Sequence, residues 1–201
     1  MRSFVALLRQ RRSAGSIVAG GEARGVVDAL SGELGLDGGA PLPLLIAHPE
    51  TLSPPPRGRP ATVEPVADPH TLAEMLALMV LVLEVPRKEL ARLYPTGFLE
   101  LTDVRAFIAR REGRPVSYAT TVRRETFTTV LNVGTRPDSR GRGEATALLA
   151  TVLARLSHDG GKLFALNAAS DATGLYRRLG FELCDEGVVW QVGPRGDLAT
   201  A

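Results

Sequence analysis

Two arginines alternate with two glycines in the stretch Pro137–Leu153, PDSRGRGEATALLATVL, at the point where a helical pattern begins. Glycine-rich turns at helix starts leave backbone N–H groups free to bind an anion. Gly141 and Gly143 would let a diphosphate approach the backbone more closely than a Cβ allows. Arg140 and Arg142 can add charge-assisted hydrogen bonds to phosphate oxygens. The stretch therefore predicts an anion-binding turn, and the alternative is a solvated Arg/Gly turn before an ordinary helix.

Three known glycine motifs can be compared with this turn. A P-loop requires a lysine followed by Ser or Thr after its last glycine, and no lysine is present here. A Rossmann fingerprint requires Gly or Ala where Thr146 stands, and its strand must belong to a βαβ unit. The third motif, R/Q-x-x-G-x-G/A, is matched by Arg140, Gly143 and Ala145. The turn therefore fits the third motif better than the other two.

The elements that must position the turn can be predicted from hydrophobic periodicity. Upstream, Thr71 and Glu74 have the spacing of a capping box, so a helix is predicted to start at Thr71 and to end before Pro86. Short connections then join three segments with strand patterns, which favours an antiparallel meander. The predicted strands of this meander span residues 104–109, 115–122 and 127–133.

Downstream of the turn, apolar residues from Ala145 to Leu156 fall on one face of a helix that Gly160 and Gly161 end. A buried strand, a second helix and a closing hairpin are predicted after it. These elements span residues 162–167, 171–179, and 181–184 with 188–192. The predicted fold class is therefore α+β, with a mixed, mostly antiparallel central sheet flanked by helices and an N-terminal extension.

Composition divides the chain into regions. Residues 1–52 are rich in Gly and Ala, and we expect an N-terminal segment or small subdomain of unclear fold. The prolines of residues 53–68 favour an extended connector. Residues 69–192 carry the strong periodicity of the main domain. The tail, residues 193–201, is expected to fray.

Charge and residue counts exclude several classes of protein. The 201 residues are 44% hydrophobic, which is enough for a core. A net charge of +2 gives by itself no indication of a polyanion partner, since nucleic-acid binders usually cluster their positive charge. Cys184 is the single cysteine and the three histidines are far apart, which disfavours disulfides and a metal site. The N-terminal apolar stretch is too short for a secretory signal, and residues 76–83 are too short to span a bilayer. We expect a cytoplasmic protein without metal, nucleic-acid or membrane partners.

Two signatures make residues 70–192 resemble the GNAT superfamily of acyl-CoA-dependent N-acetyltransferases. VGTRPDSRGRGEATALL, from Val133 to Leu149, resembles the family's pyrophosphate-binding segment. ASDATGLYRRLGF, from Ala169 to Phe181, resembles its second signature, in which a helix carries a tyrosine followed by LGF. The two occur in the family's order and at its separation. The resemblance implies that residues 69–192 form a GNAT acetyltransferase domain and that coenzyme A supplies the diphosphate.

The resemblance also implies roles for individual residues. The backbone of Val133 and Thr135 would pair with the amides of the pantetheine arm. Tyr176 would protonate the departing coenzyme A thiolate, whereas its simpler role is packing on the apolar face of its helix. Ala169 stands where the family commonly has asparagine, and Ser170 is the expected substitute. The predicted cofactor-binding residues are Val133, Thr135, Arg140, Gly141, Arg142, Gly143, Glu144, Ala145, Ser170 and Tyr176.

The motifs do not assign the general base. Many GNAT relatives use an acidic residue on the meander, but Asn132 is the nearest polar substitute in the third predicted strand. Glu100 is therefore the candidate base or acceptor contact, with Glu84 and Glu125 as alternatives. An amine with a lowered pKa would need no dedicated base.

The function implied by the resemblance is that of an acetyl-CoA-dependent N-acetyltransferase, which moves an acetyl group to a primary amine by direct transfer in a ternary complex. Acetyl-CoA is the expected co-substrate, and the acceptor is an amine on a small molecule, peptide or protein. Because GNAT relatives frequently pair, a homodimer is compatible with the resemblance. A non-catalytic acyl-CoA-binding or sensor module is the alternative. The strand without carboxylates favours it slightly, and the tyrosine signature disfavours it.

Overall fold

The fold was analysed in a computed structural model that describes residues 1, 3, 5, 6, 10, 15–56, 61–169 and 171–192. Ser170 and the predicted tail, residues 193–201, lie outside the described residues. By their contacts the residues form two compact units. Unit 1 comprises 1–45, 167–173 and 183–201, and unit 2 comprises 46–166 and 174–182.

A seven-stranded sheet has the strand order β4-β5-β6-β7-β8-β3-β9. Strands β4 to β7 pair antiparallel, and β7 pairs with β8 in parallel. The boundary between the two units runs through β3, β8 and β9. The strands are β3 (Leu44–Ala47), β4 (Thr62–Pro65), β5 (Val104–Arg111), β6 (Arg114–Arg123), β7 (Thr128–Thr135), β8 (Phe164–Asn167) and β9 (Glu182–Asp185). This mixed, mostly antiparallel sheet confirms the predicted fold class.

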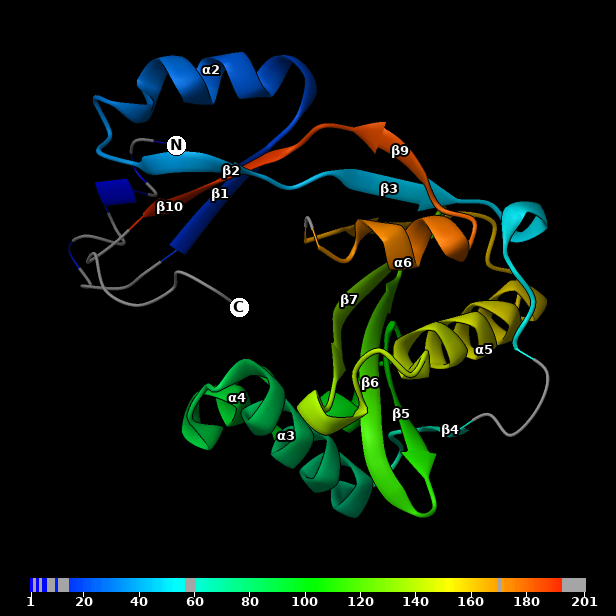
Figure 1. The fold of residues 1–201 in the computed structure, drawn as a ribbon. Helices are drawn as coiled ribbons and strands as arrows, with labels where there is room; N and C mark the ends of the chain where they lie inside the picture. Colours follow the sequence, from blue (N-terminus) through cyan, green and yellow to red (C-terminus); the bar gives the residue numbers. More distant parts are fainter. Residues whose placement is uncertain are drawn as a thin grey trace. The chain divides into compact units, whose positions relative to one another are not determined.

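The predicted meander is confirmed, since β5, β6 and β7 each begin and end within two residues of the expected bounds. Helices cover both of its faces (Figure 1): α3 and α4 lie on one side and α5 on the other. Apolar side chains of α3 and α4 bury Ala106, Ile108 and Tyr118 of the sheet. The helical segments of unit 2 are η1 (Pro49–Thr51), α3 (Pro69–Leu83), α4 (Arg87–Leu93), η2 (Thr96–Glu100), η3 (Pro137–Ser139), α5 (Glu144–His158) and α6 (Thr173–Arg178), whose first residue belongs to unit 1.

The start of α3 differs from the prediction, because Asp68 rather than Thr71 is the N-cap. One carboxylate oxygen of Asp68 accepts from the amides of His70 and Thr71, at 2.8 and 2.9 Å. The other accepts from the Thr71 hydroxyl at 2.7 Å. These bonds lower the pKa of Asp68, and the bond from the Thr71 side chain is the largest cause. The predicted capping box is therefore wrong: Glu74 instead pairs with Arg110 of β5, at 2.5 Å.

Unit 1 contains a second, three-stranded antiparallel sheet with the order β1-β10-β2. Its elements are β1 (Gly15–Ala19), α2 (Gly21–Ser31), β2 (Asp37–Pro41) and β10 (Val188–Val192). Val188 and Trp190 of β10 pack with Val27 of α2 in a buried cluster. Gly39 of β2 makes this packing possible, since a Cβ there would lie 2.3 Å from a methyl carbon of Val188.

The predicted closing hairpin is wrong, because β9 and β10 belong to different sheets. The burial pattern gives the reason. Alternate residues of β10 are buried, so one face of this strand must pack against apolar side chains. Most of β9 is exposed, and β9 therefore has no matching buried face. Gly187, in the expected turn, accepts a hydrogen bond from the Leu42 amide at 2.7 Å. A Cβ at Gly187 would lie 2.6 Å from the Leu42 carbonyl oxygen, so this close approach requires glycine.

Candidate functional site

Strand β7 carries a bulge shortly before the glycine turn. Its pairing with β6 shifts between Tyr118 and Thr120, so that Asn132 and Val133 together lie opposite one residue of β6. Asn132 has a φ of +47°, in the left-handed region that asparagine tolerates better than most residues. A bulge bends its strand and redirects the neighbouring backbone groups. This bulge was not predicted from the sequence, because it depends on the pairing of β7 with β6.

The parallel pairing of β7 with β8 covers a short part of β7. Within unit 2 its register joins Thr128 to Phe164 and Thr129 to Ala165. Strand β7 continues for six residues beyond Thr129, to Thr135. Val133 and Thr135, the two predicted pantetheine contacts, lie in this continuation and are half-buried. Their backbone groups on the β8 side lie beyond the described register.

The glycine turn has the geometry of an anion site. Gly141 and Gly143 have φ angles of +73° and +78°, which favour glycine. A Cβ at either position would meet nothing within 4 Å, so it is backbone conformation rather than crowding that calls for glycine. Helix α5 begins at Glu144, and the Ala147 amide donates to the Gly143 carbonyl. Among the described residues, the amides of residues 141–146 have no hydrogen-bond partner, as expected for a helix N-terminus with a preceding turn.

The side chains around the turn differ in their surroundings. Arg140 and Arg142 are exposed, and the Arg140 Nε donates to the Thr135 carbonyl at 3.3 Å. Glu144, by contrast, is 2% exposed. Its Oε1 accepts from Arg111 Nε at 2.5 Å, and this bond raises the pKa of Arg111. The predicted cofactor contact of Glu144 can therefore come through its amide and not through its carboxylate.

Tyr176 lies on α6 and is 8% exposed. Its ring meets that of Phe181 edge to face, with centroids 6.0 Å apart. The helix ends at Arg178, and a Cβ at Gly180, two residues later, would lie 2.0 Å from the Thr51 carbonyl oxygen. Packing thus fixes the ring of Tyr176, in agreement with the simpler role considered for it. The role of its hydroxyl stays a prediction.

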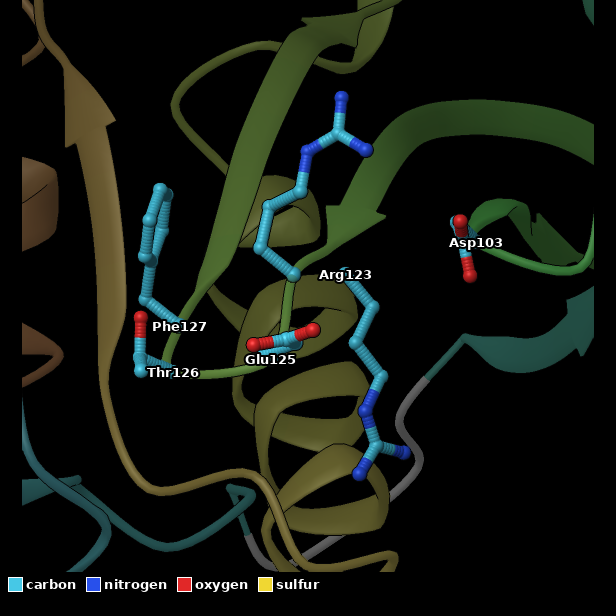
Figure 2. Close-up of a pocket in the computed structure, with 6 residues that line it drawn as sticks. Asp103, Arg123, Glu125, Thr126 and Phe127 are labelled. Carbon is cyan, nitrogen blue, oxygen red and sulfur yellow. The ribbon is translucent and has the colours of Figure 1, made fainter.

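The candidate carboxylates are spread over unit 2. Glu100 ends η2 and is exposed, and Glu84 caps α3 in a left-handed conformation with φ +55°. Glu125 lines an open pocket of about 780 Å³ at the β6–β7 turn, together with Asp103, Arg123, Arg124, Thr126 and Phe127. Figure 2 shows Arg123 and Phe127 pointing in different directions from this turn. The pocket lies at the end of β7 away from the glycine turn. Among the described residues, no contact favours one of these three carboxylates as the base.

Polar side chains gather next to the bulge, on the face of the sheet covered by α3 and α4. Asn132 Nδ2 donates to the Tyr94 hydroxyl oxygen at 2.7 Å, and the Tyr94 and Thr120 hydroxyls are 3.3 Å apart. Tyr118 is fully buried in the same cluster, and its hydroxyl has no partner among the described residues. No sequence motif predicts this group, because its members come from three separate elements. We call Tyr94, Tyr118, Thr120 and Asn132 the bulge cluster.

Two kinds of site are not found in the described part of the chain. No group of three or more His, Cys, Asp or Glu side chains there is arranged to hold a metal ion. Likewise, none of the described helices combines the length and apolarity needed to cross a membrane.

Comparison with solved structures places the fold among acetyltransferases. A GCN5-related N-acetyltransferase from Kribbella flavida is 24% identical, with a TM-score of 0.74, over 98% of this chain and 74% of that chain. One from Sphaerobacter thermophilus is 18% identical, with a TM-score of 0.65, over 94% and 63%. The ribosomal-protein-S18-alanine N-acetyltransferase from Escherichia coli is 17% identical, with a TM-score of 0.52, over 70% and 99%. At these identities the likeness is one of fold.

Comparison of the sequence itself gives the family. No curated protein matches the chain. Residues 90–190, half of the chain, match the family of the acetyltransferase (GNAT) domain. This range contains both signatures, the bulge and the glycine turn. The match confirms the resemblance seen in the sequence: the chain belongs to the GNAT superfamily of acetyltransferases.

Proposed function

We propose that the protein is an acetyl-CoA-dependent N-acetyltransferase that moves the acetyl group to a primary amine by direct transfer in a ternary complex. The observation that carries this proposal is the run of amides at residues 141–146 that have no hydrogen-bond partner in the part of the chain that the structure describes. They stand at the N-terminus of a 15-residue helix, where the helix dipole also favours negative charge. A diphosphate is the anion whose several oxygens match several converging N–H donors.

The arm of the cofactor would follow β7. A chain attached to a diphosphate in the glycine turn would pass Thr135 and Val133, which lie beyond the described register of β7 with β8. There, amides of pantetheine can pair with the strand as a further strand would. Arg140 and Arg142 would add charge-assisted hydrogen bonds, each worth about 1.5–3 kcal/mol once the ligand excludes water.

Chemistry would follow by direct attack. A neutral amine adds to the thioester carbonyl, the tetrahedral intermediate collapses, and coenzyme A leaves as a thiolate while the amide product forms. Tyr176 is the proposed acid, whose hydroxyl proton passes to the sulfur. The amine loses one proton in the same reaction, either to Glu100 as the candidate base or directly to water when its pKa is low. The acceptor is an amine on a small molecule, peptide or protein.

The experiment that tests this proposal measures coenzyme A release from acetyl-CoA with a panel of amines and peptides. We expect release that depends on at least one amine and a product whose mass is raised by one acetyl group. A chain that binds acetyl-CoA but acetylates no amine in the panel would favour the sensor module. A chain that binds no acetyl-CoA would contradict both functions.

A further inference from the structure

Tyr118 of β6 is a buried donor that no described residue satisfies. Its side chain is 0% exposed, and its hydroxyl has no hydrogen-bond partner among the described residues. Burial raises the pKa of Tyr118, so the phenol keeps its proton at neutral pH and remains a donor. Buried polar groups without a partner are rare and destabilising, which is why each one calls for an explanation.

The position of this hydroxyl is set by Gly134 of β7. The two residues lie directly opposite each other in the register of the two strands. A Cβ at Gly134 would lie 2.4 Å from the Tyr118 Cζ and 2.5 Å from its hydroxyl oxygen. The phenol therefore occupies the space that a side chain on Gly134 would fill. Its hydroxyl lies over the backbone of β7 rather than between β6 and β7.

Gly134 stands between Val133 and Thr135, in the part of β7 that extends beyond the register with β8. Six residues later the chain reaches Arg140 and the unpartnered amides of the glycine turn. A ligand held in that turn and extended along β7 would pass the Tyr118 hydroxyl. Because this hydroxyl is a donor, the group that satisfies it must be an acceptor.

Tyr94 supplies an internal comparison, because it is a second buried tyrosine of the same cluster. Its hydroxyl oxygen accepts from Asn132 and lies within hydrogen-bond distance of Thr120. The described residues thus provide hydrogen-bond partners for the Tyr94 hydroxyl and none for the Tyr118 hydroxyl. Because no described residue satisfies the Tyr118 hydroxyl, this difference favours a bound ligand as its hydrogen-bond partner.

We propose that the Tyr118 hydroxyl donates a hydrogen bond to a carbonyl oxygen of the acyl-pantetheine arm. Tyr118 would then be a cofactor-binding residue that neither sequence signature contains. This inference rests on the proposed function, since it takes the arm of acyl-CoA as the ligand of β7. Both the thioester and the two amides of the arm carry suitable oxygens, and the choice of ligand in the test separates them.

The test is Tyr118→Phe, which removes one oxygen atom and keeps the ring over Gly134. We expect the unliganded variant to be at least as stable as the wild type, because the lost hydroxyl had no partner. Its affinity for acetyl-CoA, measured by calorimetry, should fall by about 2- to 12-fold, as for the loss of one hydrogen bond. An equal loss with free coenzyme A would assign the bond to an amide carbonyl, and a loss confined to acetyl-CoA would assign it to the thioester.

Tyr94→Phe is the matched control, and its unliganded form should be less stable than the wild type because Asn132 and Thr120 lose a partner. An unchanged acetyl-CoA affinity of Tyr118→Phe would overturn the inference and leave the proposed function intact. A clear loss of stability in unliganded Tyr118→Phe would also overturn it, since it would reveal a partner within the protein. A wild type that binds no acetyl-CoA would instead contradict the proposed function itself.

Discussion

The glycine turn and the bulge cluster lie at two points along β7 and are built in opposite ways. The turn is made by consecutive residues, and its functional groups are backbone amides without hydrogen-bond partners among the described residues. The bulge cluster is made by side chains from α4 with its C-cap, β6 and β7, which meet because the strands pair. A site made of consecutive backbone groups can therefore be predicted from a sequence motif. A site made of side chains from several elements can be found only once the fold is known.

The largest effect is expected from breaking the backbone site. Gly143→Asp places a carboxylate where the diphosphate would bind, so acetyl-CoA binding should be lost while the helix content is retained. Gly143→Asn is the matched control, because asparagine has nearly the same shape, also tolerates a positive φ and carries no charge. Calorimetric measurement of acetyl-CoA affinity in both variants separates the effect of the added charge from the effect of the added side-chain volume. Normal acetyl-CoA affinity in Gly143→Asp would place the anion elsewhere.

A smaller effect, on rate rather than binding, is expected at Tyr176. Tyr176→Phe keeps the ring packed on Phe181 and removes the proposed acid. Because general acid catalysis is typically worth about 10²–10⁴-fold, turnover should fall by at least about tenfold. Acetyl-CoA affinity should change little, since the acid acts chiefly in the transition state. Steady-state rates with a saturating amine test this, and unchanged turnover with rate-limiting chemistry would return Tyr176 to a packing role.

The smallest effect is expected at Asp68, which caps the helix that covers the bulge cluster. Asp68→Ala should lower the stability of the chain and leave acetyl-CoA affinity unchanged, because the cap lies outside both sites. Asp68→Asn keeps an acceptor and should lose less. Since the pKa of Asp68 is lowered in the folded state, its contribution is present above pH 3.8 and fades as the pH falls through the lowered value.

Unfolding curves of the wild type and both Asp68 variants across the acid range measure this effect. The wild type should lose stability on acidification more steeply than either variant. Parallel curves would show that the Asp68 carboxylate contributes nothing through its charge. A loss of acetyl-CoA affinity in Asp68→Ala would mean that the helix and the cofactor site are coupled.

Much of unit 2 could be predicted because its signals are local. Apolar periodicity and short turns predicted the meander and α5. The alternating glycines predicted the turn at Gly143. The capping box failed because Asp68, three residues earlier, is the N-cap and accepts from the amides of His70 and Thr71. The bulge at Asn132 depends on the pairing of β7 with β6, so no local sequence pattern predicts it.

Unit 1 shows why the rest could not be predicted. Its sheet joins β10 to β1 and β2, which are far away in the sequence. Strand β2 reads DGGAP and is exposed throughout, so it has no alternation of apolar and polar residues to mark it. The short turn before β10 led to the prediction of a hairpin with the preceding strand. Trp190 of β10 is instead buried in the sheet that β10 forms with β1 and β2. Strands that are far apart in the sequence and lack hydrophobic alternation can be paired only when the structure is known.

The central claim is that acyl-CoA binds at the glycine turn and along the part of β7 beyond its described register with β8, and ligand-dependent stability tests it most directly. Unfolding is followed for the wild type alone, with acetyl-CoA, and with NAD at the same concentration. Acetyl-CoA at about a hundred times its Kd should add roughly 2.7 kcal/mol to the free energy of unfolding. NAD should add much less, because it has a diphosphate but no arm to pair with β7. Equal stabilisation by NAD, or none by acetyl-CoA, would contradict the account.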